Sequence, residues 1–291
     1  MQRVPARDRL KFIQPQLPRL VEEPPTSDDW IHEIKYDGYR TQVILDWDGA
    51  RAYTKTGIDW TSRYWPIVTA AEALGARSAI LDGEVIAPTA SGAPDFHALR
   101  SAMAWNAERL AFVAFDLLHL DGKDLRPLPV VERRAMLWDL VRPADGIIQF
   151  SQHVEGGGAE FFHGVEKLGL EGMVSKRRGS PYRSGESDAW LKIKCYEFSE
   201  MDLLGVKREH GKPAMALMGQ GGKYAGSAFI TLPKEIRERL WKRVQAGRKA
   251  PVGAPSVAGV EWLKPGIKAR VKHLRGEAKL RHASVKGIVE D

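Results

Sequence analysis

The sequence contains a single cysteine and no long run of apolar residues. One thiol, that of Cys195, excludes internal disulfides and any metal cluster built from cysteines. A membrane-spanning helix needs about 18 or more consecutive apolar residues, and no segment of the sequence meets that requirement. The first residues carry charge in place of the apolar core of a signal peptide. We therefore expect an intracellular, cytoplasmic protein with no membrane partner.

Acidic residues are scarce in the last third of the chain. Residues 198–291 hold 19 Lys and Arg against 9 Asp and Glu, whereas residues 1–197 hold 25 against 28. The formal charge of +7 therefore comes from a basic segment that follows a nearly neutral one. A basic surface attracts nucleic acid because each phosphate that it neutralises releases counterions. A charge that only maintains solubility explains the same composition, but the uneven distribution favours a nucleic-acid partner.

The length of 291 residues suits two moderate domains. From residue 30 onward apolar and polar positions alternate, and the pair Asp48-Gly49 between two such runs is typical of a hairpin. Antiparallel sheet is therefore predicted, and we expect an α+β domain over residues 1–197. Apolar periodicity and continuous apolar runs predict helices over residues 66–74, 131–141 and 159–168 and strands over residues 79–86 and 110–118.

The sequence pattern changes after residue 197. Short strand-like segments with glycine turns follow one another, and a helix over residues 234–244 begins behind Pro233. Several short strands with one helix are typical of an OB-fold, a small Greek-key β-barrel that often binds nucleic acid. An SH3-like barrel fits the same pattern. We expect residues 198–291 to form the OB-fold β-barrel domain.

Four short motifs are rich in lysine, in acidic residues or in glycine. A lysine amine attacks phosphorus only when desolvation or a nearby cation reduces the share of its ammonium form. Acidic residues that hold a divalent metal are therefore the expected neighbours of a nucleophilic lysine. Two lysines spaced two apart on a strand point to the same face and can reach one phosphate. In chain order the motifs are Lys35-Tyr36-Asp37-Gly38, Asp82-Gly83-Glu84, Glu171-Gly172 and Lys192-Ile193-Lys194.

Each motif alone has an ordinary structural interpretation. Asp-Gly pairs form turns, lysine is common at strand edges, and two lysines on a strand are often a solvated face. Together and in this order, the motifs predict a covalent nucleotidyltransferase. In such an enzyme Lys35 attacks the α-phosphorus of a nucleotide, and Glu84 and Glu171 bind the metal that neutralises phosphate charge.

The chain resembles the ATP-dependent DNA ligases, specifically the ligase module of bacterial ligase D proteins, which join double-strand breaks. The segment from Asp29 to Arg40 is similar to the first motif of that family, whose lysine becomes adenylated. The resemblance implies that Lys35 carries AMP and that Glu33 recognises the adenine amine. It also implies an ATP-grasp-like adenylyltransferase domain in which Ile34 and Arg40 lie at the nucleotide.

Further motifs extend the resemblance. In the family, the glutamate that corresponds to Glu84 contacts ribose or metal, and the phenylalanine that corresponds to Phe115 stacks on adenine. The fourth motif, from Glu171 onward, implies a metal ligand at that glutamate. The fifth motif implies that Lys192 and Lys194 hold the α-phosphate.

The sequence departs from the family pattern at two places. Lys55 stands where the family has an arginine near the ribose or the 5′-phosphate side, and lysine lacks the planar guanidinium that contacts phosphate bidentately. The family's final Gly-Leu-Arg-x-Asp-Lys appears here as Gly287-Ile288-Val289-Glu290-Asp291. The missing cations orient the pyrophosphate leaving group, so we expect either slow self-adenylation or substitution by Arg281 or Lys286.

The resemblance implies a three-step reaction with ATP as substrate and Mg²⁺ or Mn²⁺ as the metal. A lysyl-AMP forms, AMP passes to the 5′-phosphate at a nick or break in double-stranded DNA, and a 3′-hydroxyl displaces AMP and seals the strand. We expect a bacterial monomer that associates with the nucleoid during DNA repair, with Ku as a candidate partner.

Two alternatives remain open. An RNA ligase or an mRNA-capping guanylyltransferase shares the lysine chemistry, and nucleotide preference separates these enzymes from a DNA ligase. A catalytically weak DNA-binding accessory protein of end joining belongs to a different class, and the altered terminus is the argument for it. The complete set of lysines and glutamates argues against it.

Overall fold

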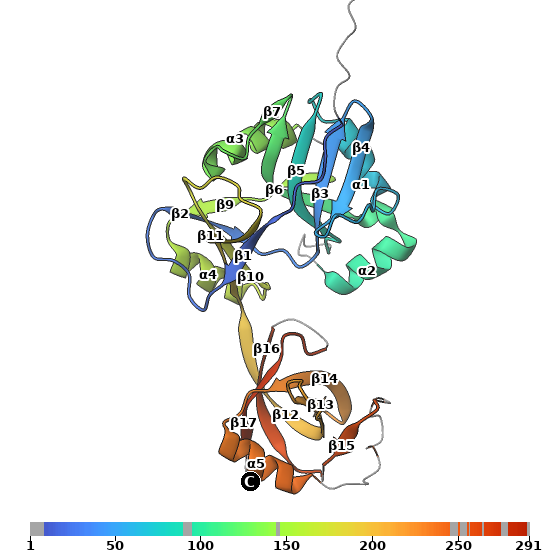
Figure 1. The fold of residues 1–291 in the computed structure, drawn as a ribbon, viewed down its shortest axis with the longest axis vertical. Helices are drawn as coiled ribbons and strands as arrows, with labels where there is room; N and C mark the ends of the chain where they lie inside the picture. The colour runs from blue at the N-terminus through green and yellow to red at the C-terminus, as the bar shows by residue number, and fades with distance from the viewer. Residues whose placement is uncertain are drawn as a thin grey trace, which may run out of the picture. The chain divides into compact units, whose positions relative to one another are not determined.

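The computed structural model describes residues 9–89, 95–143, 146–244, 250, 255, 257–263, 265–274 and 279–289. The chain divides into two compact units, residues 1–193 and 194–291. The first unit contains two sheets with helices, and the second contains a β-barrel (Figure 1). In these described segments, no helix is long and apolar enough to cross a membrane.

A mixed sheet forms the centre of the first unit. Its strand order is β4-β3-β5-β6-β7, and β8 adds to β6 in parallel. Successive side chains alternate between its faces, so Val43 and Leu45 pack on one side and Ile44 packs on the other. The strands are β3 (Tyr39–Asp46), β4 (Gly49–Thr54), β5 (Ala79–Ile86), β6 (Ala111–Leu120), β7 (Lys123–Asp124) and β8 (Ile148–Phe150).

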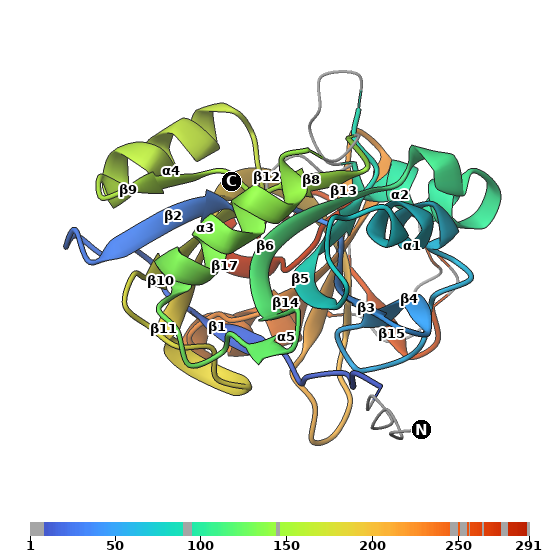
Figure 2. The same ribbon diagram turned by 90° about the horizontal axis from the view of Figure 1, so that it is seen from above.

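Helices α1, α2 and α3 cover one face of this sheet (Figure 2). Ile67, Leu99 and Leu137, one from each helix, share a buried core with Val43. The sequence predicted α1 and α3 to within two residues at each end but did not predict α2. The three helices are α1 (Trp65–Glu72), α2 (Phe96–Trp105) and α3 (Val130–Val141).

The opposite face meets a second sheet with the order β1-β11-β10-β2-β9. Trp190 on β11 packs against Ile44 and Ile80 of the first sheet, so the two sheets face each other. The N-terminal segment belongs to this sheet, because β1 pairs in parallel with β11. The elements are β1 (Gln16–Leu20), β2 (Trp30–Ile34), β9 (His153–Glu155), α4 (Gly158–Lys167), β10 (Gly172–Arg177) and β11 (Gly185–Lys194).

The second unit is a closed barrel with the order β12-β13-β14-β17-β16-β12. β14 and β17 run parallel, and α5 lies between β14 and β16 in the chain. This is the Greek-key connectivity of an OB-fold, so the SH3-like alternative is wrong. β12 begins two residues before the boundary predicted from the sequence. The elements are β12 (Tyr196–Lys207), β13 (Met215–Gln220), β14 (Lys223–Ile230), α5 (Lys234–Arg243), β15 (Val260–Trp262), β16 (Lys268–Leu274) and β17 (Ser284–Val289).

A buried ion pair joins α3 to the central sheet and yields a stability prediction. Arg133 Nε lies 2.8 Å from Asp116 Oδ1, and neither side chain is exposed. Arg133→Ala leaves the carboxylate buried without its partner, so we expect the free energy of unfolding to fall by about 3–5 kcal/mol. Urea unfolding followed by circular dichroism measures this loss.

The matched control is Arg126→Ala. Arg126 pairs with Asp124 at 2.7 Å, but both side chains are more than two-fifths exposed. Water solvates the remaining carboxylate, so the expected loss is below about 1 kcal/mol. Equal losses in the two variants would contradict the role of burial.

Candidate active site

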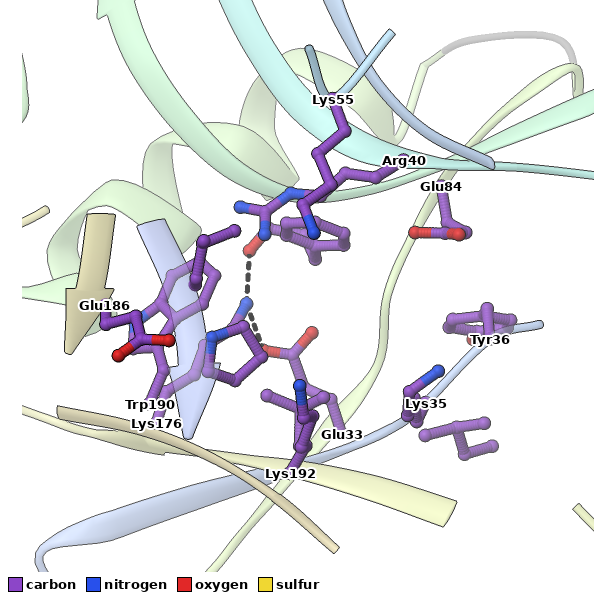
Figure 3. A pocket seen from close by; sticks show the side chains of 15 residues that line it. Glu33, Lys35, Tyr36, Arg40, Lys55, Glu84, Lys176, Glu186, Trp190 and Lys192 are labelled. Carbon is purple, nitrogen blue, oxygen red and sulfur yellow. Dashed lines mark hydrogen bonds and ion pairs between the residues drawn. The ribbon is translucent and has the colours of Figure 1, made fainter. Parts of the chain in front are cut away.

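A pocket of about 340 Å³ lies between the two sheets of the first unit (Figure 3). Its wall draws on β2 and β10 from one sheet and on β5 and β6 from the other, so residues far apart in sequence meet there. The residues predicted from the sequence that line it are Glu33, Ile34, Lys35, Arg40, Lys55, Glu84, Phe115 and Lys192.

Lys35 directly follows β2 and is positioned by its backbone. Its N–H donates to the carbonyl of Gly172 at 2.9 Å, which extends the antiparallel ladder in which Ile34 pairs with Met173. This register places the Lys35 ammonium beside Glu171, with which it forms an ion pair. The Lys35 side chain is 23% exposed and that of Glu171 is 9% exposed, so the pair is shielded yet reachable from the pocket.

Two motif glycines allow close approach of strands. A Cβ on Gly38 would lie 2.2 Å from the Val85 carbonyl oxygen and 2.9 Å from Cγ of Glu84. A Cβ on Gly83 would lie 2.5 Å from the ring of Phe112. A side chain at either position would displace β5, the strand that carries Glu84. The turn interpretation therefore misses what these glycines do.

Glu84 and Glu171 place two carboxyl groups beside the lysine. Burial, together with the charges of Glu171 and Asp82, raises the pKa of Glu84 to about 8, although Lys35 and Arg40 act in the opposite direction. A divalent cation bound by both carboxylates would favour the ionised form of Glu84 and lower its pKa. The described residues contain no group of three or more His, Cys, Asp or Glu arranged around one point. Two carboxylates that leave positions open for substrate oxygens and water suit Mg²⁺.

Glu33 is buried and held by cations. Its Oε1 lies 2.6 Å from Lys176 Nζ and 3.0 Å from Arg134 Nη1, and Ser151 Oγ donates to its Oε2 at 2.8 Å. Burial lowers the pKa of Lys176 to about 8, against the attraction of Glu33. These contacts fix the carboxylate expected to recognise adenine.

Lys176 also lies between two aromatic rings. Its Nζ lies 4.5 Å from the ring centroid of Phe115 and 4.3 Å from that of Trp190, and it donates to the Phe115 carbonyl at 3.0 Å. Figure 3 shows Lys176 with Trp190 and Glu33 in the pocket wall. Phe115 is the extra residue of a β-bulge in β6, and bulges re-aim side chains beside active sites.

Sequence reasoning assigned no role to Lys176 or Trp190. Both lie on strands that carry or follow predicted motif residues, and strand alternation offers a signal for each. Lys176 shares a face of β10 with Val174, and Trp190 shares a face of β11 with Lys192, and all four line the pocket.

Arg40 lines the pocket while its guanidinium is bound on the protein side. Its Nε and Nη2 donate to the two carboxylate oxygens of Asp82 at 3.1 and 2.7 Å, and its Nη1 donates to the Gln16 carbonyl at 2.6 Å. Its Cζ lies 5.3 Å from the ring centroid of Phe115. Arg40 therefore packs against the Phe115 ring while its guanidinium stays bound to Asp82.

Three lysines concentrate positive charge on the pocket. Burial and the charges of Lys35 and Lys55 lower the pKa of Lys192. Ammonium groups that repel one another attract an anion, so they favour the binding of phosphate. Lys194 follows on β11 on the same face by alternation, at the end of the strand and outside the residues that line the pocket.

Arg281 and Lys286 belong to the second unit. Arg281 precedes β17 and its carbonyl accepts from the Leu274 N–H at 3.2 Å. Lys286 is exposed and is the extra residue of a bulge opposite the Arg270–Val271 step of β16. Residues 290 and 291 of the altered terminal motif lie outside the described residues.

Residues 16–194 match the family model of the ATP dependent DNA ligase domain. This span contains every residue of the pocket described above. The chain belongs to the ATP-dependent DNA ligase family. The resemblance to ligase D modules and the expected α+β fold, a nucleotidyltransferase domain with an OB-fold, are thereby confirmed.

Relatives within the ligase family include multifunctional proteins. The chain is 34% identical, over 97% of its length, to the multifunctional non-homologous end joining protein LigD of Pseudomonas aeruginosa and covers 36% of that protein. It is 30% identical to the SPbeta prophage-derived DNA ligase-like protein LigB of Bacillus subtilis, over 68% of this chain and 73% of that protein. The chain thus spans about a third of the length of the LigD relatives.

A solved structure of mycobacterial DNA ligase D complexed with ATP and MES is similar throughout. It has a TM-score of 0.58 and 28% sequence identity, with 95% of each chain covered. These findings favour the DNA ligase interpretation over the RNA ligase, capping-enzyme and accessory-protein alternatives.

Glu84 gives a pH-dependent prediction. Its pKa of about 8 in the folded protein exceeds its ordinary value of 4.5. Burial of Glu84 costs no stability while the carboxyl is protonated in both states, below about pH 4.5. As the pH rises from there to about 8, the unfolded state ionises first and the folded protein loses stability. Glu84→Gln removes this dependence, so the variant should gain stability relative to wild type between about pH 5 and pH 9.

Thermal unfolding in chelator-containing buffers measures this trend. Wild type with added Mg²⁺ is the control, and a bound cation should reduce its loss of stability at high pH. A stability difference between Glu84→Gln and wild type that stays constant with pH would contradict the raised pKa.

Proposed function

We propose that this chain is a catalytic module that seals breaks in the strands of double-stranded DNA through a lysyl-AMP intermediate, with ATP as substrate. The observation that supports it best is the position of Lys35, ion-paired with Glu171 and facing Glu84 inside a pocket with further lysines. Family membership supports the same reaction.

In the first step Lys35 Nζ attacks the α-phosphorus of ATP. An N–P bond forms, the bond from the α-phosphorus to the bridging oxygen of the β-phosphate breaks, and pyrophosphate leaves. The attacking amine must first lose a proton and separate from Glu171. The ladder between β2 and β10 and the Lys35 N–H bond to Gly172 hold the Lys35 backbone, which removes part of the entropic cost of alignment.

Glu84 and Glu171 are the residues that would hold Mg²⁺ or Mn²⁺. Such an ion neutralises phosphate charge during the transfer. Its proximity would also draw Glu171 away from Lys35, leaving the amine available for attack. Burial, with a smaller contribution from the charge of Glu171, raises the pKa of Glu84, and a bound cation would favour its ionised form.

The adenosine end of the nucleotide belongs with the buried cluster. Glu33, fixed by Lys176 and Arg134, accepts the adenine amine in this proposal, and Ile34 contributes an apolar wall. Phe115 supplies an aromatic surface on which the purine stacks.

Lys192 and Lys55 face the phosphates in this proposal, and Arg40 holds the wall behind them. Lys194 would complete the phosphate site only if the end of β11 moves toward the pocket. Arg281 and Lys286 remain the proposed cations for pyrophosphate. Both belong to the second unit, near the end of the chain where the family's terminal cations are missing.

The later steps use DNA. AMP passes from Lys35 to a 5′-phosphate, and a 3′-hydroxyl then attacks that phosphorus and expels AMP. We assign the first step to an adenylyltransferase domain over residues 1–197 and DNA contact to the OB-fold over residues 198–291, where basic residues outnumber acidic ones. The proposal places the protein in the bacterial cytoplasm at the nucleoid, as a monomer that acts with Ku.

Lys35→Arg tests the nucleophile. Arginine keeps a positive charge but stays protonated, so it cannot attack phosphorus. Incubation with α-labelled ATP and Mg²⁺, followed by denaturing electrophoresis, should label wild type and leave the variant unlabelled. Addition of nicked duplex should discharge the wild-type label as strands seal.

The control is Lys55→Arg, a substitution at another lysine of the same pocket. It retains charge at a position that only contacts the nucleotide, so covalent labelling should persist. Labelling of Lys35→Arg at the wild-type level would overturn the assignment. Labelling of wild type without sealing would support the formation of lysyl-AMP and contradict the proposed transfer of AMP to DNA.

Glu171→Gln tests the metal site. Loss of one carboxylate weakens binding of the cation and its charge stabilisation, so the rate of labelling should fall at least about tenfold at low Mg²⁺. The deficit should shrink as Mg²⁺ is raised. Glu186→Gln is the matched control, because Glu186 lies in the same pocket wall. A similar deficit in both variants would reject a site at Glu84 and Glu171.

A further inference from the structure

The outward face of the β12–β16 ladder combines aromatic rings with cations. Tyr196 and Phe198 lie two apart on β12, and Arg270 and Lys272 lie two apart on β16, so strand alternation places all four on one face. Side chains of the opposite parity, such as Val271, point into the barrel core. This ladder is antiparallel and lies within the second unit (Figure 1).

Each ring on this face is paired with a cation. Arg270 Cζ lies 4.7 Å from the ring centroid of Phe198, and Lys272 Nζ lies 4.2 Å from that of Tyr196. Phe198 is nevertheless 52% exposed. A ring held by a cation and open to solvent is a surface on which another flat group can stack.

The spacing of the two pairs suits an extended strand of nucleic acid. Two residues along a β-strand cover about 6.6 Å. This is about twice the rise per nucleotide of about 3.4 Å in duplex DNA. Adjacent bases that are unpaired and pulled apart would therefore meet one aromatic–cation pair each.

The charge around these pairs suits a polyanion. Lys268 continues the row of cations on β16, although it pairs with Glu200 at 3.1 Å, and exposed Lys286 lies across the next ladder beside Arg270. By alternation Glu200 and Asp202 are the acidic residues on this face of β12, and the cations of the row together with Lys286 outnumber them. The row therefore keeps a net positive charge along the path of a phosphate backbone.

We propose that the outward face of β12 and β16 binds single-stranded DNA, with Phe198–Arg270 and Tyr196–Lys272 as consecutive stacking units. Stacking on aromatic rings beside basic residues is sequence-tolerant, because every base has a π-face. The single-stranded overhang of a broken DNA end is the form of the proposed substrate that carries unpaired bases. The inference adds a second DNA site to the proposed function and does not use the pocket around Lys35.

The test is fluorescence anisotropy of labelled oligo(dT) with the full chain. Phe198→Ala should weaken binding about tenfold, because one base loses its stacking partner. Phe198→Trp should bind at least as tightly as wild type. Phe229→Ala is the matched control, because Phe229 is a phenylalanine of the same barrel, 47% exposed on β14, and its removal should change affinity less than twofold.

The cations give an independent readout. Arg270→Gln combined with Lys272→Gln should flatten the dependence of log affinity on log salt by about 0.7 for each phosphate that is no longer neutralised. Thermal unfolding of Phe198→Ala and Phe198→Trp confirms that the barrel remains folded.

Three results would overturn the inference. Phe198→Ala could bind oligo(dT) like wild type, Phe229→Ala could weaken binding equally, or Phe198→Ala could weaken binding of blunt duplex as much as that of oligo(dT). The last result would identify a duplex-binding surface instead. Labelling with ATP separates this test from the proposed function, because Phe198→Ala should form lysyl-AMP normally. Absence of lysyl-AMP in wild type would contradict the proposed ligase function. The anisotropy result would still test whether this face binds single-stranded DNA.

Discussion

The antiparallel ladder between β2 and β10 is the constraint on which the site depends. It carries Glu33 on β2 and Lys176 on β10, with Lys35 directly after β2 and Glu171 just before β10. A shift of one residue would turn every side chain of a strand to the opposite face. The Glu33–Lys176 and Lys35–Glu171 pairs would then both be lost. One register therefore fixes the proposed nucleophile and the proposed adenine contact together.

Buried charges stiffen the walls around that ladder. Asp82 is bound by Arg40, and Asp116 by Arg133. Glu33 is likewise bound by Arg134. A buried pair of this kind adds little net stability over apolar packing, but removal of one partner is costly. Ion pairs within the central sheet, and between each of the two sheets and α3, consequently hold carboxylates and guanidinium groups in set positions beside the pocket.

The site was predictable from sequence where local motifs carry it. Lys35 and Glu84 follow from short patterns with glycine, and both line the same pocket. The position of Lys176 between Phe115 and Trp190 was not predictable, because three strands and a β-bulge create it. Local sequence does not report a bulge that depends on the register of a distant partner. The fold shows the same division. Periodicity located β5 and α5 closely, whereas the helix α2 and the parallel pairing of β1 with β11, which packing across the first unit determines, were missed.

The most direct test of the central claim is to map the site of adenylation. Wild-type protein would be incubated with ATP and Mg²⁺, digested, and analysed by tandem mass spectrometry for peptides that carry AMP. The account predicts one modified peptide, with AMP on Lys35. AMP on Lys55, Lys176 or Lys192 instead would contradict it, because each of these lysines also faces the pocket.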